Sequence, residues 1–357
     1  MANFKFTNSK ITGMSSVYGD IKINIDDEIK YYNNDINQLN KLKKMIGFES
    51  RYVASKSVTT ADMALLAAKN LLESMSYSAQ DIDSIIFVTQ SPDYNMPGNA
   101  HIIHKALNCS KNCIAIDLEY GCSGFVYGLF QANLLIQAGC NKVLLLTGDT
   151  LSKIIDVRNR ADAPVFGDGA AACIVEKTFE TNDTYFTLYS DGSGYDMMWQ
   201  QAGGYRIPVS DETKKEIRDE KGNIRTIENF YMNGFDVFNF TLSEQPKLLK
   251  DILEFSNKTK EDIDYFIMHQ ANKYIIETII KKSNIDLLKA PLKTFSDFGN
   301  QSSASIPNTI CNELSDKIQN RCTVLMQGYG IGLSWGACVT NLENTVCLKP
   351  EIYRGEY

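Results

Sequence analysis

The chain has 357 residues, of which 44% are hydrophobic and 22% charged, a composition typical of a globular protein with two domains or one large duplicated one. Its 36 basic and 43 acidic residues give a net charge of −7, which argues against a general nucleic-acid binder because phosphate contacts need a basic surface. No window approaches the roughly 18 apolar residues of a membrane span, and the N-terminal segment lacks the apolar core of a secretory signal, so we expect no membrane partner.

In the first half of the chain, strand patterns alternate with helical ones. Apolar residues that recur at three- and four-residue spacing predict helices at 59–75 and 123–139. Apolar runs rich in β-branched residues and bounded by glycine predict strands at 85–90, 113–118, 142–149 and 167–176. The predicted fold class is therefore α/β.

The second half repeats the first. Segment 72–90 is echoed without a gap by 253–271, which lies 181 positions later, and each copy reads as a helix, a capped turn and a buried strand. The strand at 142–149 is echoed by 322–329, and 167–176 resembles 334–343. A duplicated unit buries its apolar faces most simply by packing against its copy, so we expect two βαβ-type halves packed as a pseudo-dimer.

The domain boundaries follow from this duplication. We expect an N-terminal half over residues 1–178 and a C-terminal half over residues 225–357. Residues 179–224 are polar and rich in glycine and lysine, and we interpret them as a surface excursion or lid.

The chain has three histidines, so histidine chemistry has few candidates. His101 and His104 are three residues apart on a predicted helix, but no further ligand lies at metal-binding spacing, and we expect no metal site. His269 ends a predicted strand and opens a strand-to-helix junction, where α/β proteins often place functional groups. The alternative for His269 is a buried structural role.

Nine cysteines, an odd number without paired spacing, predict free thiols in a reducing cytoplasmic compartment. Cys122 alone lies where a strand turns through Gly121 into the start of a helix. The positive end of a helix dipole can lower a thiol pKa, so Cys122 is a candidate nucleophile, and a small buried thiol is the alternative. At an offset of 180 residues Cys122 corresponds to Ser302, which puts Asn300 at the analogous helix N-terminus. We therefore expect Cys122, His269 and Asn300 to converge in one site.

Four motifs in this order resemble a known family: GCSGF at 121–125, HQAN at 269–272, GNQSSAS at 299–305 and GYGIGLSWG at 328–336. They look like the thiolase superfamily, and specifically the type III β-ketoacyl-acyl-carrier-protein synthases, with similarity from about Ile46 to the C-terminus. The resemblance implies a five-layered αβαβα thiolase-like fold and a homodimer.

The resemblance also implies an acyltransferase of lipid metabolism. The Cys122 thiolate would attack an acyl thioester of CoA or of acyl carrier protein (ACP), and malonyl-ACP would then lose CO₂ and condense to 3-oxoacyl-ACP. His269 and Asn300 would donate hydrogen bonds to the enolate oxygen, and the backbone N–H groups of Cys122 and Ile331 would hold the tetrahedral oxyanion. No cofactor is implied beyond the thioester substrates.

Further residues match family positions for substrates and partners. Those implied for CoA and pantetheine are Arg160, Phe238 and Asn272, and Met96 would close the acyl pocket of the partner subunit. Those implied for docking the acidic ACP are Lys273, Lys281 and Lys282. The segment KLKKMIG at 41–47 lacks the tryptophan and arginine that clamp the CoA nucleotide in the family. This departure motivates the hypothesis of a primer other than acetyl-CoA.

Two other functions remain open. One is acyl transfer to an alcohol or amine without condensation, which the superfamily resemblance permits. The other is a non-catalytic partner subunit that shapes the tunnel of another synthase, against which the presence of Cys122 argues. The pathway, whether housekeeping fatty acids, surface sugars or secondary metabolites, is also open.

Overall fold

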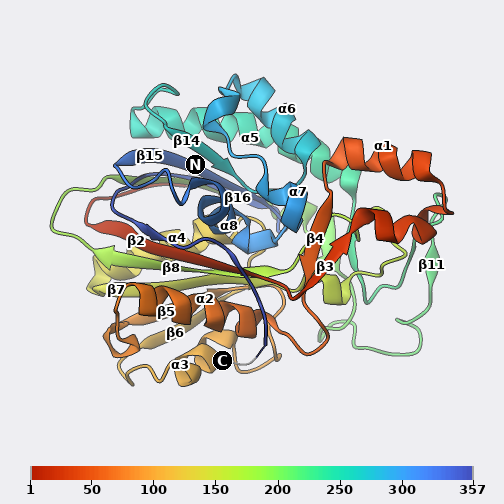
Figure 1. Ribbon diagram of the computed structural model, residues 1–357, viewed down its shortest axis with the longest axis horizontal. Helices are drawn as coiled ribbons and strands as arrows, with labels where there is room; N and C mark the ends of the chain where they lie inside the picture. The colour runs from red at the N-terminus through yellow and green to blue at the C-terminus, as the bar shows by residue number, and fades with distance from the viewer. Residues whose placement is uncertain (1, 356–357) are drawn as a thin grey trace.

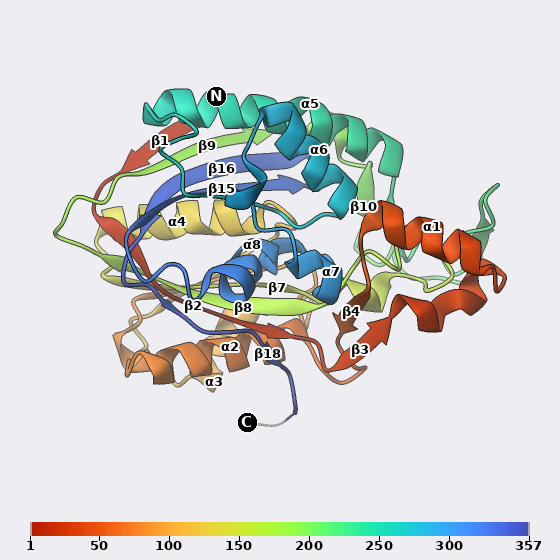
Figure 2. The same ribbon diagram turned by 45° about the horizontal axis from the view of Figure 1, so that its top comes forward.

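Two β-sheets and three layers of helices alternate in the computed structural model, which describes residues 2–355. Figures 1 and 2 show the five layers stacked from one side of the molecule to the other. The outer layers hold α5 (Gly234–Ser256) with α6 (Lys273–Ser283) on one side, and α2 (Thr60–Ser74) with α3 (Asn99–Ala106) on the other. The middle layer holds α4 (Gly124–Ala138) and α8 (Ser305–Thr309). The expected αβαβα arrangement is confirmed.

Each sheet is built mainly from one half of the chain. In spatial order the first sheet is β17 (Val346–Cys347), β2 (Ser9–Tyr18), β8 (Gly169–Lys177), β7 (Lys142–Asp149), β5 (Ser84–Val88) and β6 (Ile114–Leu118), with β18 (Glu351–Ile352) also paired to β2. The second is β1 (Ala2–Phe6), β9 (Thr184–Ser190), β16 (Ser334–Leu342), β15 (Cys322–Gly330) and β14 (Tyr265–Met268).

The same strand path occurs in both sheets, which confirms the duplication. β5 is parallel to β7, and β7, β8 and β2 follow as antiparallel neighbours. β14 is likewise parallel to β15, and β15, β16 and β9 follow as antiparallel neighbours. Equivalent strands therefore end at equivalent places around the central helical layer.

The central helix α4 lies between the two sheets and packs against strands of both. Its sequence GFVYGLFQANLLIQA is apolar on nearly all sides, as expected for a helix without a solvent face. Gly128 permits close approach to the first sheet, because a Cβ atom there would lie 2.7 Å from the Leu145 side chain. The outer helix α2 begins with a capping box of Thr59 and Asp62.

The predicted boundaries at 178 and 224 need one correction. β9 falls inside the segment 179–224 that was predicted to be a surface excursion, yet it pairs with β1 on one side and β16 on the other. The prediction is wrong for residues 184–190, because their backbone pairs within the second sheet and most of their side chains are buried. The ends of the chain also cross over, since β1 joins the second sheet and β17 and β18 join the first.

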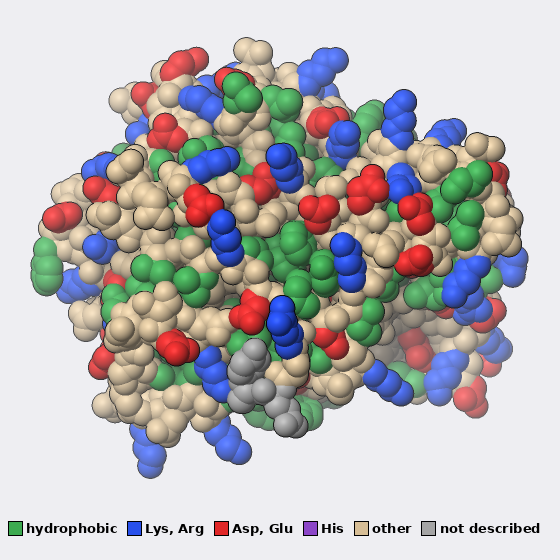
Figure 3. All heavy atoms as spheres, viewed as in Figure 1, with side chains coloured by type: hydrophobic (Ala, Val, Ile, Leu, Met, Phe, Trp, Pro, Cys, Tyr) green, Lys and Arg blue, Asp and Glu red, His purple; other side chains and the backbone are tan. Residues whose placement is uncertain are grey.

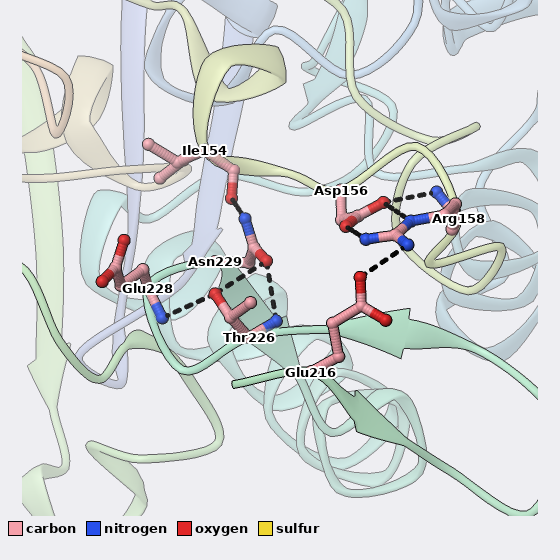
Figure 4. Close-up of polar contacts among 7 residues, drawn as sticks. All are labelled: Ile154, Asp156, Arg158, Glu216, Thr226, Glu228 and Asn229. Atoms are coloured by element: carbon pink, nitrogen blue, oxygen red, sulfur yellow. Dashed lines mark hydrogen bonds and ion pairs between the residues drawn. The ribbon is translucent and has the colours of Figure 1, made fainter. Parts of the chain in front are cut away.

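The rest of this segment pairs with residues that lie just beyond its predicted end at 224. β10 (Met198–Gln200) pairs with β13 (Phe230–Met232), and the short hairpin of β11 (Ile217–Arg218) and β12 (Ile224–Arg225) extends between them. Figure 4 shows how polar contacts attach it to the loop after β7: Arg158 donates to Asp156 at 2.7 Å and to Glu216 at 2.8 Å. The Asn229 side chain donates to the Ile154 carbonyl at 3.3 Å.

The remaining α-helices and strands are α1 (Ile36–Ile46), β3 (Ile21–Asn24), β4 (Ser50–Val53) and α7 (Thr294–Phe298).

All nine cysteines are free thiols, as predicted. Over residues 2–355, the helices are too short or too polar for any of them to span a bilayer. On the face drawn in Figure 3, basic and acidic side chains are interspersed and do not form a large patch of one sign.

Candidate active site

Cys122, His269 and Asn300 line a single cavity of about 370 Å³. Three chain segments from the two halves bring them there. Cys122 lies between β6 and α4, His269 directly follows β14, and Asn300 precedes the 3₁₀ turn Ser302–Ala304 that leads into α8. The predicted convergence of these three residues is therefore found.

Two glycines let the Cys122 loop approach β15 closely. A Cβ atom on Gly330 would lie 2.8 Å from the Cys122 Cβ, and one on Gly328 would lie 2.8 Å from the Ser123 Cα. The GYG motif is thus needed for backbone packing against the candidate nucleophile.

The pKa of Cys122 differs from the prediction. Its position at the start of α4 suggested a lowered pKa, but burial raises the pKa of the thiol to about 12, and the nearby Asp149 carboxylate adds to the increase. The Ser302 hydroxyl, 3.9 Å from the Cys122 Sγ, partly offsets this effect. The resting thiol is therefore protonated at neutral pH.

His269 is buried and neutral, since burial lowers its imidazole pKa to about 3. Its Nδ1 atom lies 2.7 Å from the Ser305 Oγ, and that oxygen also accepts the Gln270 N–H at 3.4 Å. Because Ser305 accepts from Gln270, its own hydroxyl proton is free to be donated to Nδ1. When the hydroxyl donates in this way, the neutral imidazole carries its proton on Nε2.

Asn300 is oriented by its own backbone neighbourhood. Its Oδ1 atom accepts the Ser302 N–H at 2.9 Å, which leaves the side-chain NH₂ group as a donor. The Asn300 backbone N–H donates to the Val165 carbonyl at 2.9 Å, and its carbonyl accepts the Gly167 N–H at 3.0 Å. These bonds tie the second half to the first beside the cavity.

The cavity wall is mostly apolar. Phe238 stacks on Tyr274 with ring centroids 5.5 Å apart, and both line the cavity. Asn272 also lines it and caps α6, because its Oδ1 accepts the Ile275 N–H at 2.9 Å. The lining residues that sequence reasoning missed include Met45, Phe166, Met198, Met232, Phe235 and Tyr329.

Several predicted residues lie outside this cavity. Arg160 is engaged by the β11–β12 hairpin, where its guanidinium donates to the Lys221 carbonyl and, at 3.3 Å, to the Asn223 side chain. Ile331 directs its side chain towards Gly121, where a Cβ atom would lie 2.8 Å from it. Met96 lies on the surface before α3 with 73% of its area exposed.

The three predicted docking lysines share the exposed face of α6. Lys273 begins the helix and pairs with Glu277 at 4.0 Å, whereas Lys281 and Lys282 are in its last turn. The apolar positions between them are isoleucines packed into the core. Among residues 2–355 there is no cluster of histidine, cysteine and acidic side chains suited to a metal, and His101 and His104 lie on α3.

Ser302 and Ser305 contact the candidate catalytic groups but were not predicted to do so. A signal for Ser302 did exist, since it is the counterpart of Cys122 at an offset of 180 residues. Ser305 belongs to the GNQSSAS motif, but its contact with His269 was not predicted because the two residues are 36 positions apart in the sequence.

This geometry accords with known proteins. Family models for 3-oxoacyl-[acyl-carrier-protein] synthase III match residues 116–192, and for its C-terminal region residues 253–342. A putative 3-oxoacyl-[acyl-carrier-protein] synthase 3 of Campylobacter jejuni is 37% identical over 353 residues, which cover 99% of both chains. The chain belongs to the 3-oxoacyl-[acyl-carrier-protein] synthase III family. A family enzyme of Streptococcus agalactiae is 36% identical over 83% of this chain and 88% of its own.

Solved structures of other synthases have a similar fold. A 3-oxoacyl-(acyl-carrier-protein) synthase of Burkholderia xenovorans superposes with a TM-score of 0.92 at 29% identity, covering 99% of both chains. The priming β-ketosynthase of the R1128 polyketide pathway shares the fold, with a TM-score of 0.81 at 22% identity over 95% of this chain and 97% of its own. The protein is thus a condensing enzyme of the synthase III family with a thiolase-like fold.

Proposed function

We propose that this synthase performs a decarboxylative Claisen condensation between an acyl thioester primer and malonyl-ACP, through an acyl group carried on Cys122. The observation that carries the proposal is that one cavity holds the Cys122 thiol together with the neutral His269 imidazole and the Asn300 amide. A thiol can carry the acyl group, and two neutral donors can stabilise a developing enolate.

In the first half-reaction, the Cys122 sulfur attacks the thioester carbonyl and the donor thiol leaves. The negative charge on the carbonyl oxygen needs hydrogen-bond donors in the transition state. The backbone N–H groups of Cys122 and Ile331 are proposed for this role, and the close packing of Gly330 against Cys122 supports it. Ile331 is β-branched, but its backbone N–H is available as in any residue other than proline.

In the second half-reaction, malonyl-ACP loses CO₂ and the resulting enolate attacks the acyl group on Cys122. His269 Nε2–H and the Asn300 NH₂ group would donate to the enolate oxygen. The contacts of Ser305 with His269 and of Ser302 with Asn300 support this assignment, because they leave both groups as donors towards the cavity. All groups needed belong to the chain, and we propose no cofactor.

The substrates follow from the cavity and its surroundings. Its aromatic and aliphatic wall, with Phe238 and Asn272, supports a path for pantetheine and an acyl chain. The Arg160 guanidinium donates to the Lys221 carbonyl of the β11–β12 hairpin. Met45, in the segment that lacks the family's CoA-binding tryptophan and arginine, lines the cavity. We therefore propose a primer other than acetyl-CoA. Lys273, Lys281 and Lys282 on α6 are proposed to dock ACP.

We also propose a homodimer formed along β6. This strand is at the edge of the first sheet, and Ile114 within it is 47% exposed. The first turn of α3, just after the loop that holds Met96, is tied to β6 because the Ala100 N–H donates to Asp117 at 3.1 Å. An exposed apolar edge strand is suited to pairing with a second copy, which would place Met96 beside the partner.

The test is intact-protein mass spectrometry after incubation with matched acyl-CoA and acyl-ACP donors, with Cys122→Ala as the control. We expect one acyl adduct that is absent from the Cys122→Ala variant, with longer acyl donors preferred over acetyl-CoA. His269→Ala and Asn300→Ala should still acquire the adduct but fail to decarboxylate malonyl-ACP.

Folded protein that acquires no adduct from any donor would contradict the proposal and favour a non-catalytic partner subunit. Transfer of the acyl group from Cys122 to an alcohol or amine, without condensation, would favour the acyltransferase alternative.

A further inference from the structure

A buried carboxylate lies behind Cys122 and has no part in the chemistry described above. Asp149 ends β7 and has no exposed surface. Its Oδ1 accepts the Gln90 N–H at 2.7 Å and the Thr89 hydroxyl at 3.1 Å, and its Oδ2 accepts the Ser303 hydroxyl at 3.2 Å. A buried acid with this many donors is stabilised as a carboxylate although burial raises its pKa.

Ser302 connects this carboxylate to the thiol. Its hydroxyl lies 3.9 Å from the Cys122 Sγ, and the same side chain favours the charged form of the Asp149 carboxyl, whose pKa it lowers. The side chain is fully buried, and its backbone is held in the left-handed region at φ 49° by the turn that starts the helical segment after Asn300. The Ser302 N–H donates to Asn300, so the hydroxyl of Ser302 is held between sulfur and carboxylate.

The thiol needs such a connection because it is protonated at rest and must lose its proton as it attacks. His269 lines the same cavity, but it is neutral with a pKa of about 3 and is therefore a weak base. The other titratable side chain facing the thiol is Tyr329, whose pKa is raised by burial so that it stays protonated. Within residues 2–355, Asp149 is a further titratable group beside the thiol, and both of its carboxylate oxygens accept hydrogen bonds, as a proton acceptor requires.

We infer that Ser302 and Asp149 form a proton relay for Cys122. As the sulfur attacks, the thiol proton passes to the Ser302 oxygen while the Ser302 hydroxyl proton passes to an Asp149 oxygen. The new S–C bond forms and the bond from carbonyl carbon to donor sulfur breaks, and the donor thiolate takes a proton from solvent. The proton held by Asp149 returns through Ser302 to the Cys122 sulfur when condensation releases it as a thiolate. The relay thus generates a nucleophile only during attack. Its use in acyl transfer rests on the proposed function, but its effect on the thiol does not.

The test is the rate of Cys122 alkylation by iodoacetamide, which needs no thioester substrate, with the modified cysteine identified by mass spectrometry. We expect Ser302→Ala to lower the rate at pH 7 by roughly 100-fold, the lower range of general-base catalysis. Its rate should then rise about tenfold per pH unit, because only spontaneous thiolate reacts. The wild-type rate should change little between about pH 7 and 9.

Ser303→Ala is the matched control, because Ser303 also donates to Asp149 but makes no hydrogen bond to the Cys122 thiol. It should alkylate like the wild type, Ser302→Thr should restore most of the rate, and Asp149→Asn should match Ser302→Ala if its thermal unfolding shows a native fold. Wild-type alkylation by Ser302→Ala, or an equal loss in Ser303→Ala, would overturn the relay. A normal alkylation profile without any acyl adduct would instead contradict the proposed function alone.

Discussion

The hydrogen bond between Ser305 and His269 offers the sharpest test of how this site holds its histidine. Both side chains are buried, and the Ser305 Oγ lies 2.7 Å from Nδ1. Ser305→Ala would leave Nδ1 without this partner and would remove the preference for the Nε2–H tautomer. Loss of a buried hydrogen-bond partner costs about 1–3 kcal/mol.

If that cost is expressed in the decarboxylation transition state, malonyl-ACP decarboxylation should slow by about 5- to 150-fold, at about 1.4 kcal/mol per factor of ten. Acyl-adduct formation on Cys122 should change little, because the proposed oxyanion donors of that step are backbone groups. Ser305→Thr retains a hydroxyl and should recover most of the rate. Ser256→Ala, which removes another buried serine hydroxyl, bonded to the Ile252 carbonyl, should have no effect on either step.

Nitrogen NMR of labelled histidine measures the tautomer directly, because the chain has only three histidines. The wild-type His269 signal should be that of a neutral imidazole protonated on Nε2 and should not titrate between about pH 5 and 8, given its lowered pKa. A wild-type Nδ1–H tautomer, or a Ser305→Ala variant that decarboxylates at the full rate, would refute this reasoning.

Three further predictions follow from other parts of the molecule. Gly330→Ala should abolish acyl-adduct formation measured by mass spectrometry, because its Cβ would lie 2.8 Å from that of Cys122, whereas Gly204→Ala, with open space around it, should not. Burial raises the pKa of Asp162 to about 7, so the folded state binds more protons than the unfolded state between about pH 4 and 7. The free energy of unfolding should therefore decrease as pH rises through this range, by up to about 1.4 kcal/mol per pH unit. In urea titrations Asp162→Asn should lack this part of the pH dependence, and an unchanged dependence would contradict the assignment. Ile114→Asp should convert the proposed dimer to a monomer in sedimentation experiments while the exposed Phe179→Asp should not, and a wild-type monomer would exclude the β6 interface.

The order of elements and the identity of the candidate site were accessible from local patterns. The 180-residue repeat predicted the two halves, because a duplicated apolar pattern must form equivalent strands, and β5, β7 and β8 do have equivalents in β14, β15 and β16. Cys122, His269 and Asn300 were found because each follows a strand or precedes a helix in a recognisable motif. These signals are hydrophobic periods and residue spacings, which can be identified in the sequence without knowing how the chain packs.

Other features depended on long-range contacts. The strand at 184–190 was missed because the polar residues around it hide a short run that gains its partners only from β1 and β16. The pKa of Cys122 was predicted in the wrong direction because a helix N-terminus is visible in the sequence, whereas burial and the approach of Asp149 are not.

The sequence by itself determined the fold class, the duplication and three of the residues that line the cavity, Cys122, His269 and Asn300. These features follow from local hydrophobic periodicity and from short contiguous motifs. Only the tertiary structure decided how those residues are held. The Ser305 contact with His269 and the Ser302 contact with Cys122 join residues 36 and 180 positions apart. Such contacts depend on how the helical layer lies between the two sheets, and the protonation of every buried group follows from that packing.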